Sequence, residues 1–163
     1  MDVTLADVVE ASHAVAATRS RTAKTQALAD LFARCDPEQV GVVVSHLSGV
    51  LPQRRLGVGF RSLGSLPEPA PTSTLTVAEV DAAFERLAST HGAGATASRR
   101  FEVGALMGRA TQGEQHFLRD LITGNLRQGA LDGVVLAAIA TAHAVPAATV
   151  RRAAMLAGTV AEV

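Results

Sequence analysis

Apolar residues recur at helical spacing along nearly the whole chain, and the alternation of apolar and polar residues that is typical of strands is scarce. Gly, Pro and Ser interrupt the pattern and divide it into separate helices. We expect helices at about residues 3–17, 22–34, 36–47, 58–63, 76–89, 96–109, 111–124, 132–143 and 146–156. The pattern therefore predicts an all-α fold.

Several of these helices have recognisable start signals. Asp36 precedes Pro37, which suits an N-cap followed by the first helical residue. Thr76 and Glu79 have the spacing of a capping box, in which each side chain bonds to the backbone amide of the other residue. Asp132 is expected to cap the helix that follows it.

A polar, proline-rich stretch at residues 67–75 suits neither helix nor sheet, so we expect an extended connector there. The chain is predicted to be a single domain, with a first lobe at about residues 1–66 and a second at about 76–163. When the first half is shifted by 75 positions, the separation of Gly49 and Gly124, helix caps, glycines and cations recur. This agreement favours two helical lobes about a pseudo-two-fold axis.

The composition excludes several classes of protein. In 163 residues, a hydrophobic fraction of 48% and a charged fraction of 18% exclude a disordered or coiled-coil chain. No apolar run is long enough for a membrane span, and the N-terminus lacks the pattern of a signal peptide. The lone cysteine, Cys35, cannot form an internal disulfide, which fits a reducing cytoplasm. We expect a cytoplasmic protein that acts as a monomer and has no membrane partner.

Residues with catalytic or metal-binding chemistry are scattered along the sequence. The five histidines lack the spacing of metal ligands, and we expect them at the surface or at the edge of the core. Cys35 has no histidine partner that would activate a thiolate, so we expect a small buried residue there. Residues 57–59 and 92–94 contain glycine pairs but lack the ending of a nucleotide-binding loop. The pattern predicts no catalytic residue, no metal site and no cofactor in this chain.

Cations lie at the expected starts of three helices, at residues 20–24, 92–100 and 127–133, with glycine beside them in the last two. The start of a helix attracts phosphate through its free amides and its dipole, and arginine reaches phosphates or the minor groove. With no Trp or Tyr, the chain offers few rings for stacking the bases of a single strand. Duplex DNA is therefore the predicted partner. The same pattern has a purely structural explanation, in which the glycines end helices and the arginines lie on solvent-exposed faces.

Two other functions fit parts of the pattern. A helical protein–protein scaffold explains the repeat and the net charge of zero, but not the cations at helix starts. A helix-turn-helix regulator needs a recognition helix with base-reading side chains. The Ala- and Met-rich helix around Arg151 and Arg152 suits that role poorly, and we expect these two arginines to lie outside a DNA interface.

Three blocks of sequence carry a resemblance to a known family. Residues 45–52 read Ser-His-Leu-Ser-Gly-Val-Leu-Pro and are followed by Leu-Gly-Val-Gly at 56–59. Residues 75–100 follow the proline-rich connector, and residues 117–130 read Phe-Leu-Arg-Asp-Leu-Ile-Thr-Gly-Asn-Leu-Arg-Gln-Gly-Ala. Over roughly residues 20–160, these blocks resemble the N-terminal domain of ATP-dependent DNA ligases of the archaeal and eukaryotic type, in its bacterial branch.

The resemblance implies a helical DNA-binding domain that grips nicked duplex DNA, mainly through the minor groove. In the family, adenylation and oligonucleotide-binding domains follow, and a lysine in a Lys-x-Asp-Gly motif takes AMP from ATP with a divalent metal such as Mg²⁺. Here the only lysine, Lys24, is followed by Thr-Gln-Ala, so the motif is absent. We expect this chain alone to be inactive, and the parent ligase to use ATP and Mg²⁺ in replication, repair or recombination.

The resemblance also implies partners and contact residues. The expected partners are nicked double-stranded DNA, which the protein meets at the nucleoid, and the downstream catalytic domains of the same parent. The DNA-contact positions of the family fall on eight residues of this chain: Ser20, Arg21, Arg54, Thr96, Arg99, Arg127, Gly129 and Gly133.

Overall fold

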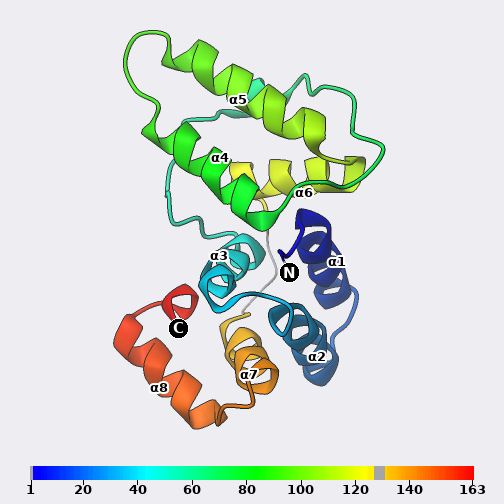
Figure 1. The fold of residues 1–163 in the computed structure, drawn as a ribbon, viewed down its shortest axis with the longest axis vertical. Coiled ribbons are helices and arrows are strands. Elements are labelled where there is room, and N and C mark those ends of the chain that lie inside the picture. Colours follow the sequence, from blue (N-terminus) through cyan, green and yellow to red (C-terminus); the bar gives the residue numbers. More distant parts are fainter. Residues whose placement is uncertain (1, 127–130) are drawn as a thin grey trace.

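The protein is all-α, as predicted (Figure 1). The computed structural model describes residues 2–126 and 131–163, and within them the only strand-like feature is one isolated β-bridge. The α-helices are α1 (Leu5–Ala16), α2 (Arg21–Phe32), α3 (Pro37–Ser48), α4 (Val77–Ser89), α5 (Ala95–Arg109), α6 (Gln112–Thr123), α7 (Asp132–Ala142) and α8 (Ala147–Ala157), and the 3-10 helices are η1 (Phe60–Leu63) and η2 (Val160–Glu162). Every expected helix is present, with ends that differ by no more than about two residues.

The starts of the helices follow local rules of capping. Capping boxes begin α1, α4 and α6 at Thr4, Thr76 and Thr111. Asp36 occupies the predicted cap position of α3, but its side chain makes no capping hydrogen bond. The prediction for Asp132 is wrong, because Asp132 is the first residue of α7 and Leu131 occupies the cap position.

One continuous hydrophobic core joins helices from both halves of the chain. Its largest fully buried side chains are Phe32, Phe84, Leu5, Leu28, Leu31, Leu47, Leu75, Leu87, Met107, Leu118, Leu121 and His46. Cys35 is buried, as predicted, and burial raises the pKa of its thiol to about 11. The thiol is therefore protonated and unreactive at neutral pH. In the described part of the chain, no helix combines the length and the apolar character that crossing a membrane requires.

The two halves are related by a pseudo-two-fold axis at the isolated antiparallel β-bridge, which lies just before α1 and α4. The amide of Leu5 donates to the carbonyl of Leu75 at 2.8 Å, and the amide of Val77 donates to the carbonyl of Val3 at 3.0 Å. Leu5 and Val3 in the first half correspond to Val77 and Leu75 in the second half. The two hydrogen bonds are therefore equivalent under the two-fold rotation. The packing of the helices has the same symmetry. The first helix of each half packs against the third helix of the other half, because α1 packs against α6 and α4 packs against α3.

Two ion pairs repeat the symmetry. Arg34, just after α2, pairs with Asp7 in α1 at 2.7 Å, and Arg109, at the end of α5, pairs with Glu79 in α4 at 2.9 Å. Burial acts to raise the pKa of Asp7, but hydrogen bonds from the capping threonine and the guanidinium outweigh it and lower the pKa. The pKa of Glu79 is lowered by the amide of its capping threonine and by Arg109. Each pair therefore ties the start of one helix to the end of the next in the same way.

The ends of α3 and α6 also match. Gly49 and Gly124 take the C-cap positions with φ values of +74° and +72°, in the left-handed region that glycine tolerates best. The loops that follow meet each other, since a Cβ on Gly49 would lie 2.9 Å from the carbonyl oxygen of Leu126. The predicted pseudo-two-fold arrangement is thus visible in caps, ion pairs and loops.

The last helices return to the first half of the chain. α7 packs along α2, α8 packs on α7, and η2 packs against α3. In Figure 1, α7 and α8 accordingly lie below α3, with α7 between α2 and α8, away from α4, α5 and α6. The spatial grouping therefore differs from the predicted lobes, because residues 132–163, assigned to the second lobe, lie with α1, α2 and α3.

The segment at residues 67–75 has no regular secondary structure and is held against the second half. The Gln115 side-chain amide donates to the carbonyl of Pro67 at 3.1 Å, and the Ser73 hydroxyl donates to the Glu114 carboxylate at 2.5 Å. Glu114 and Gln115 are buried, so these bonds fix the path of the segment.

Candidate nucleic-acid interface

The starts of α2 and α7 lie next to each other. Ser20 caps α2 by accepting a hydrogen bond from the amide of Ala23 at 3.2 Å. Arg21, the first residue of α2, donates from Nη2 to the carbonyl of Gly133 at 3.4 Å. A Cβ on Gly133 would lie 3.1 Å from the same nitrogen, so the absence of a side chain there lets the guanidinium approach the backbone of α7. Three of the predicted contact residues are thus close together.

This junction is basic. Arg21, Gly133 and Arg151 line a small hollow of about 80 Å³ between α2, α7 and α8. Both guanidinium groups are exposed, and no carboxylate of a described residue lies within 4.0 Å of either. Uncompensated guanidinium groups beside helix starts suit a phosphate. The sequence analysis expected Arg151 outside a DNA interface, and nothing local indicates that α8 packs on α7 and brings Arg151 into one hollow with Arg21.

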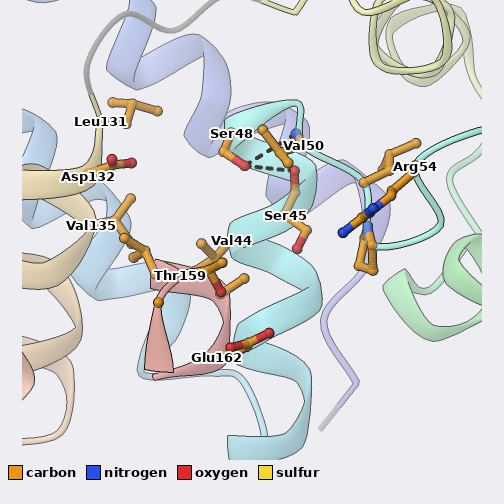
Figure 2. A pocket seen from close by; sticks show the side chains of 15 residues that line it. Val44, Ser45, Ser48, Val50, Arg54, Leu131, Asp132, Val135, Thr159 and Glu162 are labelled. Carbon is orange, nitrogen blue, oxygen red and sulfur yellow. Dashed lines mark hydrogen bonds between the residues drawn. The ribbon is translucent and has the colours of Figure 1, made fainter. Parts of the chain in front are cut away.

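Arg54 lies apart from this junction, in the loop after α3. It has φ +59°, a left-handed conformation that costs a non-glycine residue about 1–2 kcal/mol. It lines a hollow of about 570 Å³ that also includes Asp132 and Glu162. Figure 2 shows Arg54 across this hollow from Asp132 and Val135. With two carboxylates on its wall, the hollow suits a phosphate less well than the junction of α2 and α7 does.

The third predicted helix start, that of α5, is in the other half of the molecule. Thr96 is exposed in the first turn of α5. Arg99 is half-buried and donates to the carbonyl of Leu87 at 3.4 Å and to the carbonyl of Thr90, at the end of α4. Gly57 makes room for it, since a Cβ there would lie 2.5 Å from the guanidinium carbon. Arg99 therefore holds the end of α4, a role that sequence reasoning missed.

Two predicted contact residues, Arg127 and Gly129, lie outside the described residues. Each remaining one has the place given above: Ser20, Arg21 and Gly133 at the junction of α2 and α7, Arg54 in the loop after α3, and Thr96 and Arg99 on α5. The structure thus joins two of the three predicted helix starts and keeps the third in the other half.

The interior has an unexpected polar residue. His46 in α3 was expected at the surface or the core edge, but it is fully buried, with its ring 5.7 Å from that of Phe84 in α4. Burial lowers the pKa of His46 to about 4, with a weaker opposing effect from Asp81, so the ring is neutral at physiological pH. The other four histidines are exposed. Among the described residues, no three His, Cys, Asp or Glu side chains gather as metal ligands would.

The comparisons with known proteins agree on one family. Residues 57–140 match the family described as DNA ligase N terminus. A protein named "Probable DNA ligase" from Nocardioides sp. is 53% identical over 161 residues, which cover 96% of this chain and 32% of that protein. Proteins of the same name from Streptomyces griseus and Kineococcus radiotolerans are 52% and 53% identical, covering 98% and 94% of this chain and 31% of each relative. The chain spans about a third of the length of the curated relatives it matches.

Proposed function

Because the chain belongs to the DNA ligase N-terminus family, we propose that it is the DNA-binding module of a bacterial ATP-dependent DNA ligase. In this role it grips nicked duplex DNA through phosphates and the minor groove. The rest of the full-length protein then seals the nick in replication, repair or recombination, in the cytoplasm at the nucleoid. The grip is indifferent to base sequence, because phosphate contacts carry no sequence information.

The junction of α2 and α7 is the observation that carries this proposal. Two helix starts and two arginines, Arg21 and Arg151, meet there without a carboxylate partner among the described residues. Amides at a helix start and guanidinium groups are both donors without acceptor capacity, so they favour an anion over other ligands. A duplex offers a regular row of such anions.

The catalytic chemistry belongs elsewhere in the full-length protein under this proposal. Lys24 is half-buried on α2, is not followed by Asp-Gly, and has no cluster of metal-ligating side chains near it in the described part of the chain. These residues do not fit ATP or Mg²⁺. We therefore assign nucleotide and metal binding to the remaining two-thirds of the parent, which is also the module's partner within the same chain.

Binding to three labelled DNA molecules tests the proposal. Fluorescence anisotropy at low salt compares a nicked duplex, the intact duplex and a single strand of the same length. Both duplexes should bind more tightly than the single strand, because the chain has few aromatic rings for stacking. Arg21→Ala should weaken duplex binding about tenfold, and Arg152→Ala, which removes an exposed arginine from α8, should leave it nearly unchanged. Preference for the single strand, or no binding, contradicts the proposal.

An apolar surface on α8 favours a second candidate, a helical protein–protein scaffold. Met155 and Leu156 are 84% and 83% exposed, although long apolar side chains usually avoid water. The duplex affinity of the parent separates the two functions, and the double variant Met155→Ser, Leu156→Ser checks that the apolar surface of α8 plays no part in that affinity. A DNA-binding module retains its duplex affinity in this variant, whereas a scaffold has no duplex affinity in either form.

A further inference from the structure

A second arginine-lined hollow lies on the other half of the molecule. It has a volume of about 240 Å³ and lies between η1, the start of the 67–75 segment and α5. Arg61 of η1 and Arg100 of α5 line it, together with the hydroxyl-bearing residues Ser62 and Ser65. No carboxylate lines it, and neither arginine has an ion pair among the described residues.

The pseudo-two-fold axis relates part of this hollow to part of the one at the junction of α2 and α7. The axis pairs α2 with α5, and a shift of 75 positions carries Arg61 and Ser62 onto Leu136 and Ala137, which line the first hollow. An arginine also lies against a glycine beside each hollow, although these contacts are not at matching positions of the repeat. Arg21 of α2 lies against Gly133 of α7, and Arg99 of α5 lies against Gly57, just before η1. Each of the two hollows therefore holds two arginines, Arg21 with Arg151 and Arg61 with Arg100. The arginines themselves are not related by the repeat, since the shift carries Arg61 onto Leu136.

The second hollow is also open and firmly built. A Cβ on Gly104 of α5, which lines it, would meet no atom within 4 Å. Its opposite wall includes Pro67, whose carbonyl is held by the buried Gln115 at 3.1 Å. Two guanidinium groups and two serines on a fixed wall are all able to donate hydrogen bonds to a phosphate.

We propose that Arg61 and Arg100 form a second phosphate clamp, which holds the DNA backbone on the far side of the pseudo-two-fold axis from Arg21 and Arg151. This inference rests on the proposed duplex-binding function. A duplex has local two-fold axes that relate the phosphates of its two strands, so a protein whose halves are related by a pseudo-two-fold axis can present one hollow to each strand. The clamp explains why both arginines lack carboxylate partners in a chain whose net charge is zero.

A pair of glycine variants tests the clamp without removing any packed group. Gly104→Glu places a carboxylate in the open hollow, and Gly113→Glu places one on α6, where a Cβ also meets no atom within 4 Å. Both variants change the net charge equally, and glutamate favours a helix more than glycine does, so neither should lower the melting temperature. We expect Gly104→Glu to weaken duplex affinity at least about fivefold, and Gly113→Glu less than about twofold.

The salt dependence of binding identifies the lost contact as a phosphate. Arg61→Ala and Arg100→Ala should each reduce the slope of log K against log salt by about 1, and Arg152→Ala should leave the slope unchanged. If Gly104→Glu fails to fold, these arginine variants decide the matter alone. The second clamp is overturned, and the proposed function stays intact, if Arg21→Ala weakens binding while Arg61→Ala and Arg100→Ala keep the affinity and the salt slope of the parent. A parent chain that binds no duplex would overturn both.

Discussion

Arginine side chains have two different roles in this chain, and the partners of each guanidinium separate them. Arg99 is half-buried and donates to two carbonyls at the end of α4, where a cation also favours the negative end of the helix dipole. Arg21 is exposed and makes one long bond of 3.4 Å to the carbonyl of Gly133. The hydrogen bonds of Arg99 stabilise the end of α4. Arg21 keeps most of its guanidinium donors available to a ligand.

We therefore predict that Arg99→Ala and Arg21→Ala differ in stability. Arg99→Ala should lower the free energy of unfolding by about 2 kcal/mol, because it leaves two carbonyls without their charged donor. Arg21→Ala should change it by less than about 0.5 kcal/mol, since it removes only a weak exposed contact. Urea unfolding followed by circular dichroism gives both values. Equal losses in the two variants would mean that Arg99 does not hold the end of α4.

His46 makes stability depend on pH in a defined window. Its pKa is about 4 in the folded protein, because of burial, against an ordinary value of 6.5. Between these values the unfolded chain binds the proton and the folded chain does not, so stability is lost as the pH falls. The shift corresponds to about 3 kcal/mol, fully present above pH 6.5 and lost near pH 4.

The variant His46→Leu, of similar volume, isolates this contribution. We predict that the parent loses about 3 kcal/mol more than His46→Leu between pH 7 and pH 4 in urea unfolding experiments. The carboxylates titrate in both proteins, so their effect cancels in the difference. A difference that stays constant with pH would show that His46 is not held neutral by the core.

The glycines at the ends of α3 and α6 have the same backbone conformation but different surroundings, so they can be compared as two helix ends. Gly49 and Gly124 have nearly the same φ, but a Cβ would meet the carbonyl of Leu126 at 2.9 Å in the first case and no atom within 4 Å in the second. Gly124→Ala should therefore cost only the left-handed conformation, about 1 kcal/mol. Gly49→Ala should cost about 1–3 kcal/mol more, because the loops must move apart. Thermal unfolding measures both, and equal costs would contradict the close approach of the two loops.

The individual helices were predictable because their signals are local. Apolar periodicity and capping threonines such as Thr76 fixed their number and ends closely. Apart from the cap position of Asp132, the failures concern contacts between elements that are distant in sequence. The return of α7 and α8 to α2, the burial of His46 against Phe84, and the role of Arg99 at the end of α4 each depend on packing that no local pattern encodes. Arg61 and Arg100 were missed for the same reason, since only tertiary packing brings them to one hollow.

At the scale of the whole molecule, the module should carry no covalent chemistry of its own. A lysine nucleophile needs a nucleotide pocket and an activating environment. Lys24 on α2 is followed by Thr-Gln-Ala, and among the described residues no cluster of metal-ligating side chains forms. We predict that incubation with labelled ATP and Mg²⁺ leaves the chain unlabelled, as judged by gel autoradiography and intact mass. Label on Lys24 would refute the separation of DNA binding from catalysis.

The central claim is that this chain holds duplex DNA by its phosphates. The most direct test is the affinity of the 163-residue chain for a nicked duplex, measured by anisotropy over a series of salt concentrations. Because the net charge is zero, binding depends on local contacts, and about four to six neutralised phosphates predict a slope of log K against log salt of roughly −4 to −5. A slope near zero, or equal affinity for a single strand, would contradict the account.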